Sequence, residues 1–252
     1  MGRRPEATPI TFMRVHPCPE RSASGRQDGF TLIELMTVIA IIGILAAVLM
    51  PTVASVRTSA SRSKTRVQFS QWASAIEGFR HEYGYYPAFD PTNNVNGGAT
   101  TSAGDMHRFH DTLAGKRRDG TALPAANADA TADPPPPESQ NVHGIQFLQF
   151  TEQEVFSAAF SDPARRNLLH DAFENTDIAV LVDKNLDGVI NDTDYPDKPT
   201  VSPPDNPALR LSPGTADFPP GTGSAGGIRA GVLFYSAPPK SVDSSQLIMS
   251  WK

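Results

Sequence analysis

Cysteine is nearly absent from this chain: the one cysteine among 252 residues is Cys18, close to the N-terminus. A disulfide within the chain needs two cysteines, so disulfide stapling of a folded domain is excluded. If the domain carries a staple, the staple must be a metal ion or the packing of side chains.

Basic residues are also scarce, with 22 Lys and Arg against 27 Asp and Glu and a net charge of −5 at neutral pH. No basic patch is interleaved with aromatic residues, so nothing indicates a nucleic-acid partner. The sequence also lacks a nucleophile elbow, a phosphate-binding glycine loop and a zinc signature. We therefore expect a protein that is not an enzyme.

Charge is almost missing from residues 30–50, where Glu34 is the single charged residue. As a helix, these roughly 21 residues are long enough to cross the bilayer core of about 30 Å. A carboxylate in such a segment is costly unless a partner compensates its charge. An ordinary signal anchor that happens to contain a glutamate is one interpretation, but Glu34 then stays unexplained.

The string that opens this apolar run is Gly29-Phe30-Thr31-Leu32-Ile33-Glu34. It resembles the type III signal sequence of type IV pilins and of type II secretion pseudopilins. The resemblance implies that a prepilin peptidase cleaves between Gly29 and Phe30 and that the new amine of Phe30 is methylated. It also implies that Glu34 pairs with the amine of a neighbouring subunit during assembly. Gly43 and Pro51 would let the helix melt locally or bend as it packs.

The resemblance divides the chain into a cleaved cytoplasmic leader (1–29), a transmembrane or filament-core helix (30–55) and a periplasmic or extracellular head (56–252). The leader can start at Met1 or at Met13. It lacks the apolar h-region and the small-residue cleavage site of a secretory signal peptide. Cleavage at its end would therefore keep the membrane segment in the mature product.

Aromatic and aliphatic residues continue beyond the apolar run at spacings of three and four, which predicts one face of a helix. They are Phe69, Trp72, Ile76, Phe79 and Tyr83. Val53, Val56, Ala60 and Val67 are expected to continue the same stripe. Gly84 and Pro87 predict the end of the helix. We expect one helix from Phe30 to Tyr83, about 80 Å long, whose second half forms a wall of the head.

Three β-branched or aromatic runs predict strands at 177–183, 228–236 and 246–251, the last two paired antiparallel. The fold class is therefore α+β and pilin-like, with a long N-terminal helix packed on a small C-terminal antiparallel sheet.

Short helices are expected near 105–115, after Thr151, and from Asp162 to Leu169 or Phe173. The polar regions around 90–140 and 196–227 are expected to lie outside the core.

A second chemical signal lies at Asp183–Asp194, which fits the twelve-residue Ca²⁺ loop. Gly188 stands at the position of the sharp turn, and Ile190 can anchor the loop to a core. The expected ligands are Asp183, Asn185, Asp187, the carbonyl of Val189, Asn191 and Asp194. A polar turn after a strand is the alternative. A bound Ca²⁺ would neutralise these carboxylates and order the loop, and the exclusion of disulfides favours such a structural role.

Two further polar motifs are expected to be solvent-exposed. His107 and His110 form an H-x-x-H pair beside Asp111, but a metal site needs at least three converging ligands. The run Lys116-Arg117-Arg118 is expected to be solvated.

The favoured function is that of a type II secretion pseudopilin in the bacterial inner membrane, single-pass, with its head in the periplasm. The Gly-Tyr-Tyr-Pro turn at 84–87, the lack of cysteine after residue 29 and the calcium loop favour it. The usual Asp-Pro-Trp-Gly segment of major pseudopilins is absent. Expected partners are other pseudopilin subunits, in a homo- and hetero-oligomeric filament, and the prepilin peptidase and methyltransferase. The alternatives are a type IV pilus pilin, a membrane-anchored calcium-binding module with a dockerin-like loop and, more distantly, an anchored hydrolase.

Overall fold

The computed structural model describes residues 29–89, 93–97, 107–125, 135–157, 159–220 and 226–252. The predicted leader, including Cys18, lies outside the described residues except for Gly29. The chain separates into two compact units, residues 1–51 and 52–252, and the boundary directly follows Pro51. Each unit is described by itself.

Helix α1 spans Leu32–Tyr83 and confirms the single long helix that the sequence predicts. It ends at Gly84, which has a φ of +81° and donates its amide to the Arg80 carbonyl at 2.7 Å. A left-handed glycine in this place satisfies one of the carbonyls that the last helical turn leaves unpaired. By length and composition α1 can cross a membrane, and its most apolar stretch is not buried within the protein.

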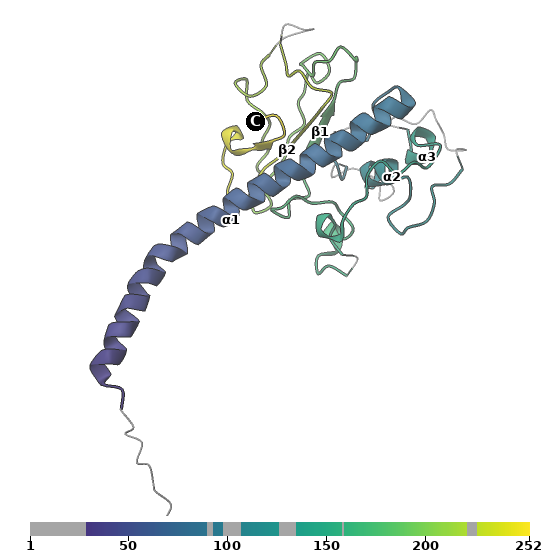
Figure 1. Ribbon diagram of the computed structural model, residues 1–252. Coiled ribbons are helices and arrows are strands. Elements are labelled where there is room, and N and C mark those ends of the chain that lie inside the picture. The colour runs from purple at the N-terminus through teal and green to yellow at the C-terminus, as the bar shows by residue number, and fades with distance from the viewer. Residues whose placement is uncertain (1–28, 90–92, 98–106, 126–134, 158, 221–225) are drawn as a thin grey trace, which may run out of the picture. The chain divides into compact units, whose positions relative to one another are not determined.

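A three-stranded antiparallel sheet with the order β1-β2-β3 forms the other layer of the second unit (Figure 1). Its strands are β1 (Ile178–Val182), β2 (Val232–Ser236) and β3 (Ile248–Met249). In the register, Val180 lies opposite Phe234, and Tyr235 lies opposite Met249. The three predicted strands and the antiparallel pairing of the last two are confirmed, although all three strands are shorter than predicted.

The predicted aromatic stripe of α1 packs on one face of this sheet, where Figure 1 shows α1 running across β1 and β2. Phe69 and Trp72 are fully buried. The ring of Phe234 stacks on Phe69 at 5.4 Å and meets Trp72 edge-on at 5.7 Å. Val67, which was expected in the stripe, is 58% exposed. In this turn of the helix, Thr65 and Gln68 are the residues buried on the face toward the core.

The other face of the sheet carries a second core, and loop residues supply part of it. Val201, Leu211 and Phe218 are buried there, from a region that we expected to lie outside the core. Phe89, Val95, Phe109 and Leu113 similarly enter the core under α1 from the other polar region. The expectation that both regions lie outside the core was wrong. Short backbone pairings such as Val201–Leu211 fix the loops, and isolated apolar residues of the loops then reach the core.

The remaining helices are short: α2 (Arg108–Ala114), α3 (Pro137–Gln140) and the 3₁₀ turns η1 (Glu152–Glu154), η2 (Pro163–Arg165) and η4 (Ser244–Gln246). Helix α2 and the capping box of Thr151 at η1 agree with prediction. The helix predicted from Asp162 to Leu169 or Phe173 is wrong, since only η2 forms. Asn167 adopts a φ of +61°, which breaks a helix, and Leu169 then pairs with Val155.

Candidate functional site

The start of α1 is organised by a reciprocal pair of side chains, Thr31 and Glu34. The amide and the hydroxyl of Thr31 both donate to Glu34 Oε2, at 2.8 and 2.7 Å. The Glu34 amide in turn donates to Thr31 Oγ1 at 3.3 Å. This is a capping box, which satisfies amides that the first turn of a helix otherwise leaves unpaired. The carboxylate therefore has a partner within its own chain.

The capping box uses only one oxygen of Glu34. The other oxygen, Oε1, makes no hydrogen bond with the described residues. Phe30, directly before the box, is 76% exposed. Glu34 can thus hold the helix start through Oε2 while Oε1 remains able to accept from a cation.

The other two residues assigned to assembly, Gly43 and Pro51, both lie within α1. A Cβ built on Gly43 meets no atom within 4 Å, so the glycine is not required by any packing contact in this structure. Pro51 is the last residue of the first unit. Their predicted roles in bending during assembly stay predictions.

The Asp183–Asp194 loop begins where β1 ends, so the sheet fixes its first residue. Asp183 is buried, and its two carboxylate oxygens accept from the amides of Asp187 at 3.2 Å and Gly188 at 2.8 Å. Asn185 Oδ1 accepts from the same Asp187 amide at 3.0 Å, and Asn185 Nδ2 donates to Asp187 Oδ2 at 3.2 Å. The side chains of Asp183 and Asn185 therefore meet at one backbone amide, and the side chain of Asp187 contacts Asn185.

The last part of the loop turns back through Asn191 and Asp194. Asp194 Oδ2 accepts from the Asn191 amide at 3.3 Å, and Asn191 Oδ1 accepts from the Thr193 amide at 2.7 Å. Partial burial raises the pKa of Asp194, and the nearby charges of Asp183 and Asp187 raise it further. The three carboxylates are therefore close enough to repel one another, which a cation between them would relieve.

Val189 and Ile190 turn their side chains into the protein, so that the loop is held from behind. Ile190 and Ile228 exchange two backbone hydrogen bonds, each of 2.9 Å. A Cβ on Gly227, beside this pair, would lie 2.3 Å from the Ile190 carbonyl oxygen. In the described part of the chain no three His, Cys, Asp or Glu side chains form a metal-binding group, and the predicted site would depend on Asn and backbone oxygens as well.

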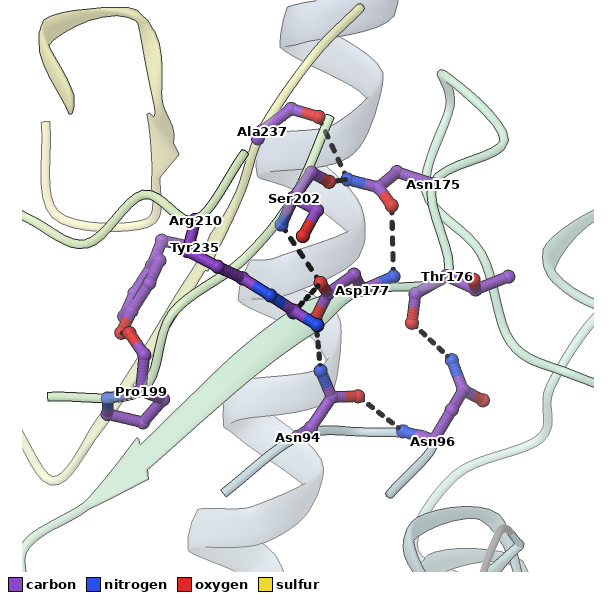
Figure 2. A network of polar contacts seen from close by, with 10 residues as sticks. All are labelled: Asn94, Asn96, Asn175, Thr176, Asp177, Pro199, Ser202, Arg210, Tyr235 and Ala237. Carbon is purple, nitrogen blue, oxygen red and sulfur yellow. Dashed lines mark hydrogen bonds and ion pairs between the residues drawn. The ribbon is translucent and has the colours of Figure 1, made fainter. Parts of the chain in front are cut away.

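A polar network at the start of β1 fixes the opposite end of the strand (Figure 2). Asp177 accepts from the Ser202 amide at 2.9 Å, from Arg210 at 3.1 Å and from the side-chain amide of Asn94. Asn175 donates to the carbonyls of Ser202 and Ala237 at 2.9 and 2.8 Å. Burial raises the pKa of Asp177. This network joins loops to the sheet and has a structural role.

The H-x-x-H motif and the basic run lie together in space. His110 is buried, and its Nδ1 lies 2.8 Å from Asp111 Oδ1. Burial lowers the pKa of His110. The expectation that His110 is exposed was therefore wrong. Arg117 is exposed as predicted, but Arg118 is half-buried, which the polar sequence around it gives no sign of.

Comparisons with known proteins agree with the features at the helix start. The family model described as the prokaryotic N-terminal methylation motif matches residues 24–50. A fimbrial protein of Neisseria meningitidis serogroup B is 40% identical over 77 residues, which are 31% of this chain and 43% of the relative. Type IV major pilin protein PilE1 of Neisseria gonorrhoeae is 38% identical over 80 residues, 32% of this chain and 46% of the relative.

A type II secretion protein is similar in the same way. The type II secretion system core protein G of Pectobacterium carotovorum subsp. carotovorum is 35% identical over 63 residues, 25% of this chain and 40% of the relative. The chain thus spans less than half the length of these relatives, and no solved structure matches it. The methylation motif, the long helix and the small antiparallel sheet together support a type IV pilin-like protein, a description that fits both the fimbrial relatives and the type II secretion relative.

Proposed function

We propose that this protein is a structural subunit of a membrane-anchored filament and not an enzyme. A prepilin peptidase cleaves the precursor between Gly29 and Phe30, and the amine of Phe30 is then methylated. The apolar part of α1 holds the subunit in the inner membrane as a single span, with the head in the periplasm. The observation that supports this proposal most strongly is the methylation motif at residues 24–50. The matched residues include Glu34, which lies in the first turn of α1.

In the filament, the helices of neighbouring subunits pack together, and the positive amine of one Phe30 meets the Glu34 carboxylate of another. The Oε1 oxygen, which the capping box leaves available, is the acceptor in this pair. A charge buried among apolar helices is tolerated when an opposite charge compensates it. Cleavage at Gly29 creates that opposite charge, so processing would precede assembly.

We further propose that the filament is a type II secretion pseudopilus, which the Gly84-Tyr85-Tyr86-Pro87 turn and the similarity to core protein G support. The second candidate is a type IV pilus pilin, which the similarity to the two Neisseria proteins favours. Deleting the gene in its own host separates the two: loss of protein secretion with intact surface pili supports the first, and the reverse result supports the second.

The test of processing uses coexpression with a prepilin peptidase. The mass of the product should fall by the mass of residues 1–29 and rise by one methyl group, and Gly29→Ala should prevent both changes. A wild-type product that keeps its leader would contradict the proposal.

The test of assembly uses Glu34→Gln, which the structure singles out. Glutamine can still accept from Thr31, as it does in many capping boxes, but it carries no charge. If the charge pairs with Phe30, the variant is cleaved and yet fails to form filaments. Thr31→Ala is the matched control, since it removes the capping hydroxyl and keeps the carboxylate. Normal filaments from Glu34→Gln would refute the pairing.

We also propose that the Asp183–Asp194 loop binds Ca²⁺ as a structural ion, as its oxygen donors and mutually repelling carboxylates suggest. The ligands would be Asp183, Asn185, Asp187, the Val189 carbonyl, Asn191 and Asp194. Ca²⁺ bound by the folded state alone raises the melting temperature. Asp187→Ala should abolish this rise, and the exposed Asp197→Ala should preserve it. A wild-type protein that does not respond to Ca²⁺ would identify the loop as a polar turn.

A further inference from the structure

Two adjoining cavities in the second unit share the side chains of Arg118 and Asn167. The larger has a volume of about 690 Å³ and the smaller about 470 Å³. Pockets for small molecules usually occupy roughly 300–1,000 Å³. Each cavity is therefore large enough for a ligand the size of a monosaccharide, and the calcium loop contributes to neither.

Arg118 brings a guanidinium with one unsatisfied nitrogen to the wall between the cavities. Its Nη1 is buried and has no hydrogen-bond partner among the described residues. Burial lowers the pKa of Arg118 to about 10, so the guanidinium is still charged at neutral pH. The nearby Asp111 carboxylate is already 2.8 Å from the His110 ring nitrogen. A buried donor without an acceptor is costly, and a ligand oxygen on Nη1 would remove that cost.

The charges around Arg118 restrict which anion fits. The larger cavity is also lined by a second arginine, Arg117, and by three acids, Asp111, Asp119 and Glu138, so that its acids outnumber its arginines by one. These acids would repel a ligand with several negative charges, such as a phosphate ester, and they accept hydrogen bonds from hydroxyl groups. The fitting ligand therefore carries one carboxylate for the guanidinium, which binds the two oxygens of a carboxylate side by side. The rest of the ligand must donate hydrogen bonds.

The larger cavity also offers an apolar surface from Leu123, Pro136 and Pro137. The C–H face of a sugar ring can pack on such a surface, while its hydroxyls reach the acids. We propose that this cavity binds a sugar that carries a single carboxylate, a uronic acid, with Arg118 as the residue that binds the carboxylate. The proposal concerns the head alone and does not depend on the filament function.

The experiment uses the full chain in detergent and D-glucuronate as the probe, with isothermal titration calorimetry and saturation-transfer NMR as readouts. Binding of glucuronate should saturate, and D-glucose, which has the ring and lacks the carboxylate, should bind about tenfold more weakly or worse. This comparison uses the unaltered protein, so it does not depend on the folding of any variant.

Variants then identify the residues that bind the sugar. Arg118→Gln should weaken glucuronate binding at least about tenfold, since it removes the charge-assisted hydrogen bonds. Asp119→Asn should strengthen binding a few-fold by removing a like charge while it can still accept from Thr121. Arg66→Gln is the matched control, because Arg66 is an exposed arginine of α1 that lines neither cavity. It should change binding by less than about twofold.

Three results would overturn the proposal. The first is the absence of saturable binding up to about 50 mM glucuronate, well above the millimolar affinity expected of a single charged contact. The second is equal binding of glucose and glucuronate, which would exclude recognition of the carboxylate. The third is tighter binding of N-acetyl-glutamate amide than of glucuronate, which would assign the cavity to an acidic peptide.

Discussion

The clearest test of how the Asp183–Asp194 loop is built compares two glycines that have nearly the same positive φ and differ in their surroundings. Gly227 has a φ of +87° and Gly188 has a φ of +82°. A Cβ on Gly227 would lie 2.3 Å from the Ile190 carbonyl oxygen and 2.7 Å from the Asn191 Cβ. A Cβ on Gly188 would meet no atom within 4 Å. Substituting alanine at each position therefore separates backbone strain from collision.

The expected magnitudes follow from these contacts. An alanine forced into the left-handed region costs about 1–2 kcal/mol at either position. At Gly227 the collision must also separate Ile190 from Ile228, which share two backbone hydrogen bonds of 2.9 Å. Each such bond contributes about 1 kcal/mol, and shifting the buried Ile190 adds about as much again. We expect a loss of about 1–2 kcal/mol for Gly188→Ala and about 3–5 kcal/mol for Gly227→Ala.

The assay is urea unfolding of the full chain in detergent, followed by tryptophan fluorescence and fitted with a common slope. Trp72 is fully buried and reports on the packing between α1 and the sheet. Equal losses for the two variants would refute the reasoning, because they would show that the close approach of Gly227 to Ile190 has no role in holding the loop.

Two other predictions concern the core. Burial raises the pKa of Asp171 in the folded state, so its contribution to stability is complete below the unfolded pKa of about 3.9 and is lost as the pH rises through the folded pKa. Asp171→Asn does not titrate, so the wild type should lose stability relative to this variant as the pH rises above about 4, the unfolded pKa. Urea unfolding at each pH measures the difference, and a difference that stays constant would contradict the raised pKa. Trp72→Ala should lower the free energy of unfolding by about 3–5 kcal/mol, because four aromatic rings contact the indole. Val67 lies on the same helix and is 58% exposed, so Val67→Ala should change the free energy of unfolding by less than about 0.5 kcal/mol. Similar losses for both would contradict the assignment of the buried face.

Much of the architecture could be predicted because it depends on local periodicity. The spacing of Phe69, Trp72, Ile76 and Phe79 places these residues on one helix face, and all four are buried against the sheet. The helix end at Gly84 follows from the same kind of local rule, since a left-handed glycine stops a helix.

The predictions that failed concern segments whose structure is decided by contacts with residues distant in the sequence. Nothing near Asp162 in the sequence shows that Asn167 turns left-handed so that Leu169 can pair with Val155. The burial of Arg118 likewise depends on how the segments that line the two cavities come together.

The capping box at Thr31 was a different kind of omission. The Thr-x-x-Glu pattern that correctly indicated the turn after Thr151 also stands at Thr31-Glu34, at the start of the apolar segment. The candidate site could therefore have been described more fully from the sequence, because its geometry is set within four consecutive residues.

The outer edge of β1 affects how the heads of neighbouring subunits can contact one another in the proposed filament. The backbone of residues 93–95 pairs with this edge: the Val95 amide donates to Ile178 at 2.9 Å, and the Val180 amide donates to Asn93 at 2.8 Å. An open strand edge would invite the sheet of a neighbouring subunit to add to it, and such growth is difficult to reverse. Because this edge is already paired within the chain, a neighbouring head can touch it only through side chains. Subunits joined in that way can be added and withdrawn without fusing into a continuous sheet.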